Sequence, residues 1–216
     1  DVLATVGNDL TIIYNDMHHN DAVWFWTADN GGLQDISGFD QLVAVGNDLR
    51  ISDNFGLQDI SGFSRLANVA NDLNLSVNAA LQNITGFHQL ATVGNDLHIF
   101  YNQVLQDISG FDQLETVGSD LRIASNHGEH NGGLRDISGF HRLATVGNDF
   151  NILSNDALQD ISGFDQLATV GNLMHISGNV ALQRISGFDQ LGIVMSSLSI
   201  DQNGALEDIS GFNWLV

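Results

Sequence analysis

The chain has 216 residues, of which 26 are Asp or Glu and 6 are Lys or Arg, giving a formal net charge of −20 at pH 7. This balance argues against nucleic acid or an anionic membrane as a partner, because phosphate binding needs clustered Lys and Arg. The sequence contains no cysteine, which excludes disulfide bonds, a thiol nucleophile and thiolate metal ligands. No apolar run approaches the roughly 20 residues that span a bilayer.

A heptapeptide repeat organises the whole chain. The segment LQDISGF at residues 33–39 returns in close variants that begin at Leu57, Leu81, Leu105, Leu134, Leu158, Leu182 and Leu206. The copies are 24 residues apart, except for one interval of 29 residues. Self-similarity at a fixed period is the signature of a repeat architecture, so we expect one repeat domain over residues 1–216.

In chain order, a long insertion at residues 16–32 precedes a short extended piece at residues 33–36. Gly38 and Phe39 then turn the chain, with a 3₁₀-like stretch at residues 39–42. Residues 48–52 alternate polar and apolar side chains, which predicts a strand with Leu49 inside and with Arg50 and Ser52 outside. This pattern recurs in each unit, and a second insertion lies at residues 127–133. We therefore expect an all-β fold, a β-solenoid of eight 24-residue turns about 4.8 Å apart.

Two columns of the repeat do not vary within the chain. One holds phenylalanine, at Phe39, Phe63, Phe87, Phe111, Phe140, Phe164, Phe188 and Phe212. The other holds asparagine, at Asn15, Asn54, Asn78, Asn102, Asn126, Asn155, Asn179 and Asn203. We expect a stacked aromatic spine and an asparagine ladder, the latter at a tight corner where Asn takes the left-handed conformation.

The repeat reads F-x-x-L-x-x-V-G-x-x-L-x-I-x-x-N-x-x-L-x-x-I-x-G, as in FHQLATVGNDLHIFYN at residues 87–102. It resembles the receptor L-domain type of leucine-rich repeat, and more closely the leucine-rich repeat arrays of bacterial surface proteins. The resemblance covers the chain except for the two insertions. It implies a secreted or cell-surface recognition solenoid without catalysis. The chain differs from animal growth-factor receptors in lacking cysteine and in placing Gly directly after Val, as at Val93–Gly94.

The outward positions of the predicted strand at residues 48–52 and its equivalents vary most between units. A fixed framework that carries a varied face is how solenoids build binding surfaces, although unconstrained variation of a solvated face gives the same pattern. Aromatic and arginine side chains are typical interface anchors. The candidate ligand-binding residues on this face are Tyr14, Arg50, His98, Phe100, Tyr101 and Arg122.

Both insertions follow a ladder asparagine, so we expect them at the same edge of the rod. The long insertion contains Trp24, Phe25 and Trp26, which are candidates for protein contact or for stacking on sugars. Its alternative role is a cap over the first turns. The short insertion contains His127, Glu129 and His130, which are candidate metal ligands without the spacing of a catalytic zinc site.

Aspartate recurs in two columns of the repeat. One contains Asp9, Asp48, Asp72, Asp96, Asp120 and Asp149, and the other contains Asp35, Asp59, Asp107, Asp136, Asp160 and Asp208. Like charges on neighbouring turns repel, so we expect turn N–H groups to cap these carboxylates. The alternative is that Ca²⁺ ions bridge them. No other cofactor is expected.

The known catalytic motifs are absent from the sequence, so we expect no enzyme. The leading hypothesis is an extracellular or cell-surface adhesion module for a protein or glycan. One alternative is a subunit that stacks head to tail into a filament, because neither end has a clear polar cap. Another is an ice-binding solenoid, since threonine rows recur and only Ala44, Asn68 and Ile193 interrupt them. Sequons at Asn74 and Asn83 would accept glycans in a eukaryotic secretory pathway.

Overall fold

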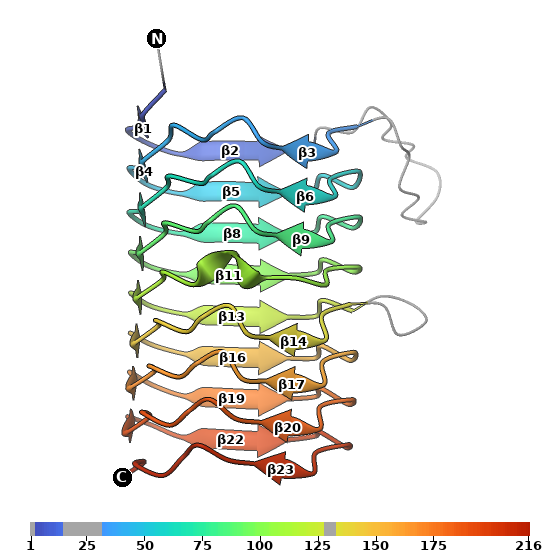
Figure 1. Ribbon diagram of the computed structural model, residues 1–216, viewed down its shortest axis with the longest axis vertical. Helices are drawn as coiled ribbons and strands as arrows, with labels where there is room; N and C mark the ends of the chain where they lie inside the picture. Colours follow the sequence, from blue (N-terminus) through green and yellow to red (C-terminus); the bar gives the residue numbers. More distant parts are fainter. Residues whose placement is uncertain (1–2, 15–31, 128–132) are drawn as a thin grey trace.

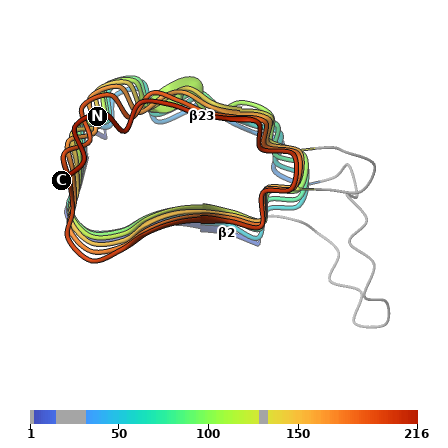
Figure 2. The same ribbon diagram turned by 90° about the horizontal axis from the view of Figure 1, so that it is seen from below.

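The computed structural model describes residues 3–14, 32–127 and 133–216. Parallel strands stack turn upon turn into a β-solenoid of about seven turns, close to the eight that the repeat predicts (Figure 1). The one helical element in the described residues is η1 (Ser109–Phe111), a single 3₁₀ turn. The expected all-β solenoid is therefore confirmed. Viewed along its axis, the turns superpose into a flattened cross-section (Figure 2).

The first sheet runs along one long side of this cross-section. Its eight parallel strands, in spatial order, are β2 (Leu10–Ile13), β5 (Leu49–Ser52), β8 (Leu73–Ser76), β11 (Leu97–Phe100), β13 (Leu121–Ala124), β16 (Phe150–Leu153), β19 (Met174–Ser177) and β22 (Leu198–Asp201). Equivalent positions of the repeat pair with one another, so that Arg50 lies beside Asn74 and Asn74 beside His98. We call the outer surface of this sheet the long-strand face.

Burial on this sheet follows the expected alternation in part. Leu49 and Ile51 are buried and Arg50 is exposed. Ser52, however, is buried rather than exposed, and the equivalent Ser76 is buried as well. Larger outward side chains cover these small ones, as where the Arg50 Nε donates a hydrogen bond to the Ser52 Oγ over 2.7 Å.

A second eight-stranded parallel sheet, which the repeat pattern did not predict, closes one narrow side. Its strands are β1 (Thr5–Val6), β4 (Ala44–Val45), β7 (Asn68–Val69), β10 (Thr92–Val93), β12 (Thr116–Val117), β15 (Thr145–Val146), β18 (Thr169–Val170) and β21 (Ile193–Val194). Two residues are too few to show a period. Glycine follows the valine in six of these eight strands. It permits close stacking, because a Cβ on Gly118 would lie 2.0 Å from the Gly94 carbonyl oxygen.

The opposite long side carries two shorter parallel sheets. One contains β3 (Asp35–Ile36), β6 (Asp59–Ile60) and β9 (Asn83–Ile84), and the other contains β14 (Asp136–Ile137), β17 (Asp160–Ile161), β20 (Arg184–Ile185) and β23 (Asp208–Ile209). The turn between them forms η1 instead of a strand. There the Asp107 Oδ1 accepts a hydrogen bond from the Ser109 N–H over 2.7 Å, which bends the backbone after an isolated bridge to Asn83.

The 3₁₀-like stretch expected at residues 39–42 is a single turn. The Leu42 N–H donates to the Phe39 carbonyl oxygen over 2.9 Å, without continuing into a helix.

The core contains the inward columns of all turns, with the phenylalanine column as its spine. Neighbouring rings from Phe39 to Phe212 stack with centroids 5.0–5.4 Å apart. Phe150 packs edge-on against Phe164, 4.9 Å between centroids. This ring spacing is close to the roughly 4.8 Å between neighbouring strands of a sheet, so each turn adds one ring to the stack.

The asparagine column is buried from Asn54 to Asn179 and hydrogen-bonded from turn to turn. The Asn102 Oδ1 accepts the backbone N–H of Asn78 over 3.1 Å, and the Asn102 Nδ2 donates to the Leu75 carbonyl oxygen over 3.0 Å. The same Nδ2 donates to the Asn126 Oδ1 over 3.2 Å. These contacts recur along the ladder, at Asn54, Asn78, Asn126, Asn155, Asn179 and Asn203.

The left-handed backbone expected at the ladder asparagine lies one residue earlier. The residue that precedes the ladder asparagine has a positive φ in every turn. These residues are Tyr14, Asp53, Val77, Tyr101, Ser125, Ser154, Gly178 and Gln202. The φ values run from 51° to 69°. The asparagine side chain thus stabilises the corner while its neighbour adopts the unusual backbone.

We predict that Asn102→Ala lowers the free energy of unfolding by about 2–4 kcal/mol. The substitution leaves the buried Asn78 N–H without its acceptor, at about 1–3 kcal/mol, and removes the hydrogen bond from the Asn102 amide to the Leu75 carbonyl, at about 1 kcal/mol. Urea denaturation checks this. Asn151→Ala, on the long-strand face, is the control and should change stability by no more than about 0.5 kcal/mol; equal losses in the two variants would contradict the ladder.

A second prediction concerns the left-handed column, where a β-branched residue is strained. Val77 has a φ of 56°, and Gly178 stands at the equivalent place of the repeat with a φ of 69°. Val77→Gly should raise the free energy of unfolding by about 1 kcal/mol, and Gly178→Val should lower it by a similar amount. Thermal unfolding of both variants measures these two changes in stability. A loss of stability in Val77→Gly would show that side-chain packing outweighs the backbone strain.

Candidate functional site

Four of the candidate residues meet on the long-strand face. His98 and Phe100 lie on β11, Tyr101 follows this strand, and Arg122 lies on β13. The Phe100 ring contacts the rings of His98 and Tyr101 edge-on, with centroids 6.0 and 5.4 Å away. The Arg122 guanidinium lies over the same ring, 5.7 Å from its centroid. We call these four residues the aromatic patch.

The local structure explains why the patch forms here. Strand alternation points His98 and Phe100 to the same face, and parallel register places Arg122 beside His98. Phe100 lies between Ser76 and Ala124 in the sheet, two small residues that leave room for its ring. The left-handed corner then carries Tyr101 outward, where its side chain is 54% exposed.

The remaining candidates lie away from this patch. Arg50 is separated from His98 by Asn74 in the sheet, and its guanidinium is paired with Asp53 at 3.4 Å. Tyr14 is 63% exposed at the corner after β2, in the first turn. Trp24, Phe25 and Trp26 lie outside the described residues. The structure therefore brings together four of the nine predicted ligand-binding residues.

Of the candidate metal ligands, only His127 lies within the described residues. Its Nδ1 lies 2.7 Å from the Ser154 carbonyl oxygen, and its backbone forms an antiparallel bridge with Gly133. One ring nitrogen is thus engaged by the backbone of the next turn. Glu129 and His130 lie outside the described residues.

The first aspartate column caps the following turn, as expected. The Asp72 Oδ1 accepts hydrogen bonds from the Asn95 Nδ2 over 2.6 Å and from the Asp96 N–H over 3.2 Å. The same arrangement holds for Asp9, Asp48, Asp120 and Asp149. Backbone and amide donors therefore offset the repulsion between neighbouring turns.

The second aspartate column is less well compensated. Among the described residues, the Asp59 Oδ1 and the Asp160 Oδ1 are buried without a hydrogen-bond partner. Burial raises the pKa of Asp59 above the ordinary 3.8, and the carboxylate of Asp35 adds to the rise. Burial, followed by the Asp160 charge, likewise raises the pKa of Asp136. Arg184 occupies this column beside Asp160 and pairs with its carboxylate at 2.9 Å.

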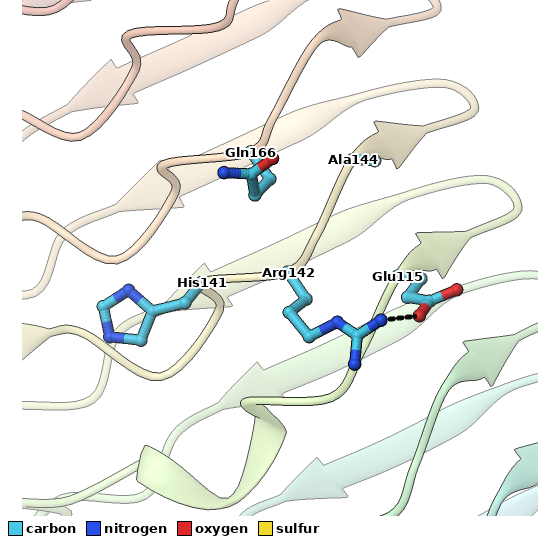
Figure 3. Close-up of a pocket in the computed structure, with 5 residues that line it drawn as sticks. All are labelled: Glu115, His141, Arg142, Ala144 and Gln166. Carbon is cyan, nitrogen blue, oxygen red and sulfur yellow. Dashed lines mark hydrogen bonds and ion pairs between the residues drawn. The ribbon is translucent and has the colours of Figure 1, made fainter.

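A shallow hollow lies elsewhere, beside the second sheet. Glu115, His141, Arg142, Ala144 and Gln166 line it (Figure 3). Its charged groups bind one another: an Arg142 terminal nitrogen contacts the Glu115 Oε1 at 2.5 Å, and the His141 Nδ1 lies 2.8 Å from the Asp165 Oδ2. Both pairs are exposed to solvent.

The threonine row lies on the second sheet. Thr92, Thr116, Thr145 and Thr169 pair in unbroken register, while Asn68 and Ile193 flank them. All four threonines are half-buried. The row is thus regular over four turns.

In the described part of the chain, no helix has the length and hydropathy needed to cross a bilayer. Comparison with protein-family models, with curated proteins and with solved structures found no match to this chain.

We predict that Asp59→Asn raises the free energy of unfolding at pH 7 by on the order of 1 kcal/mol, the Coulomb energy of one like-charge neighbour. Asn83 already occupies the next position of this column. Because folding raises the pKa of Asp59, the folded chain holds its proton more tightly, and stability from this group is lost as the pH rises above 3.8.

Urea denaturation from pH 3 to pH 7 checks this prediction. The difference between Asp59→Asn and the unaltered chain should vanish at pH 3, where both side chains are neutral. A variant that is less stable at pH 7 would mean that the carboxylate stabilises the turn.

Proposed function

We propose that this chain is a non-catalytic recognition module that binds an extracellular protein or glycan through the aromatic patch. The observation that carries this proposal is the clustering of His98, Phe100, Tyr101 and Arg122 on one exposed face. Aromatic residues and arginine dominate the binding energy of protein interfaces. Such a cluster on the surface of a regular sheet therefore has the composition of an interface anchor.

The chemistry of the patch suits a ligand with an apolar face and an acidic group. Tyr101 presents a half-exposed ring on which a sugar ring or an apolar side chain can pack. The Arg122 guanidinium, held over Phe100, donates hydrogen bonds in a planar fork that matches a carboxylate. In a chain with a net charge of −20, this arginine is the local attraction for such a group.

The class of solenoid and its location are part of the same proposal. The motif at residues 87–102 supports a leucine-rich repeat of the receptor L-domain-like type, and this resemblance supports a secreted or cell-surface location. It also supports adhesion as the role and the absence of catalysis. The filament of head-to-tail subunits stays a prediction, which sedimentation velocity over a concentration series would test.

Ice binding is a second candidate, favoured by the four threonines in register on the second sheet. We rank it below recognition because Ala44, Asn68 and Ile193 occupy the same row. Thermal hysteresis of the purified chain distinguishes the two.

The test of recognition is binding of the chain to an immobilised panel of oligosaccharides and extracellular matrix proteins, measured by biolayer interferometry. The double variant Phe100→Ala with Tyr101→Ala should weaken binding to the recognised member at least about 30-fold, since two anchors of about 1 kcal/mol or more each are lost. The matched control, Leu153→Ala with Ser154→Ala, alters the same two columns two strands away.

The control should bind as the unaltered chain does. Equal binding by the patch variant, or no binding to any member by the unaltered chain, would contradict the proposal.

A further inference from the structure

A second set of side chains meets at the beginning of β11 and β13 on the long-strand face. Asp96 precedes β11, His98 lies on it, and Asp120 precedes β13. One ligand atom from each of these three residues lies within 4.8 Å of the other two. All three residues are half-buried, and the cluster combines two carboxylates with one imidazole.

The Asp96 carboxylate differs from the other members of its column. Asp48, Asp72, Asp120 and Asp149 each accept a side-chain amide from an asparagine of the next turn. At Asp96 the equivalent position is Ser119, and within the described residues Asp96 accepts only the Asp120 N–H, over 3.0 Å. The substitution removes the neutral donor that elsewhere occupies this carboxylate.

The imidazole and the remaining carboxylate oxygens leave this cluster able to take a cation, since the described hydrogen bonds to the Asp120 carboxylate, from Asn148 and Asp149, engage its Oδ1 alone. The described contacts of His98 are the edge of the Phe100 ring and its backbone pairing, so its ring nitrogens are not engaged by a described hydrogen bond. Arg122, its neighbour in register, directs its guanidinium over Phe100, toward the strand end and away from the two aspartates. The net charge of −20 favours cations over the whole surface.

The equivalent positions in the neighbouring turns and at His175 do not repeat the combination of two aspartates and one histidine. Asn74 stands at the His98 position between Asp72 and Asp96, and Arg122 stands there between Asp120 and Asp149. His175 repeats the histidine, but Leu173 replaces the aspartate before it, and its Nε2 lies 3.1 Å from the Asp201 Oδ2. This histidine is therefore a natural comparison for His98.

We propose that Asp96, His98 and Asp120 form a binding site for one divalent transition-metal ion of the zinc type. Zinc accepts mixed imidazole and carboxylate ligands at about 2.0–2.2 Å, usually in a tetrahedron. Side-chain rotations of half-buried residues bring the three ligand atoms to that separation from one ion. Three protein ligands leave the fourth position to water or to an oxygen of a bound partner. The site stands independently of the proposed function, although it borders the aromatic patch.

The experiment titrates the full chain, freed of metal with a chelator, with ZnCl₂ by calorimetry and with CoCl₂ by visible absorption. His98→Asn and Asp96→Asn should each weaken binding of one ion at least about tenfold. His175→Asn should leave binding unchanged. Ser119→Asn keeps all three ligands but restores the amide donor to Asp96, so it should weaken binding several-fold.

A spectroscopic readout separates ligation from a general loss of structure. Zinc should shift the imidazole nitrogen resonances of His98 and leave those of His175 in place. The proposal is overturned if the unaltered chain binds no zinc, or if His98→Asn retains every ion that the unaltered chain binds. It is also overturned if His175→Asn loses as much affinity as His98→Asn.

Discussion

The buried asparagine ladder is the interaction on which the rest of the structure depends. Each amide accepts the backbone N–H of the asparagine on the previous turn and donates to a carbonyl of the strand before it. Both groups are buried, where an unpaired polar atom is costly. One side chain therefore joins two turns and their strands, and its repetition holds the parallel strands in register.

The same ladder determines where the candidate site lies. It stabilises a corner at which the preceding residue takes the left-handed conformation. This corner ends each long strand and turns one side chain outward. At the fourth long strand that side chain is Tyr101, next to Phe100 and within reach of the Arg122 column. The framework thus sets the positions, and the residues that vary between turns decide what each position presents.

The negative charge of the aspartate columns is stabilised by different groups in different turns. Where an asparagine amide and a backbone N–H face a carboxylate, as at Asp72, these hydrogen-bond donors stabilise its negative charge. Where the donors are missing, the charge is left to other means. The carboxyl of Asp59 has a raised pKa, Asp160 has Arg184, and Asp96 has the imidazole of His98 nearby. The positions at which a residue departs from the repeat, such as Ser119 and Arg184, are therefore the ones whose substitution tests how a carboxylate is compensated.

The sequence predicted the period, the β-solenoid and the strand at residues 48–52, because these depend on patterns that repeat within 24 residues. It did not predict the second sheet, whose strands of two residues carry no period. It placed the left-handed residue at the asparagine rather than before it, since propensity favours Asn there whereas the buried ladder needs the Asn side chain elsewhere. The patch around Phe100 was predicted as residues on one face, but the meeting of Asp96 with His98 and Asp120 depends on neighbouring turns.

The most direct test of this account is native-state hydrogen exchange of the ladder residues, followed by nuclear magnetic resonance. The backbone amides of Asn78, Asn102 and Asn126 donate to buried side-chain oxygens of the next turn. If the ladder holds the turns together, these amides exchange as slowly as those in the middle of the long strands. Exchange at the rate of exposed turns would contradict it, and would mean that the sheets and the phenylalanine spine hold the register alone.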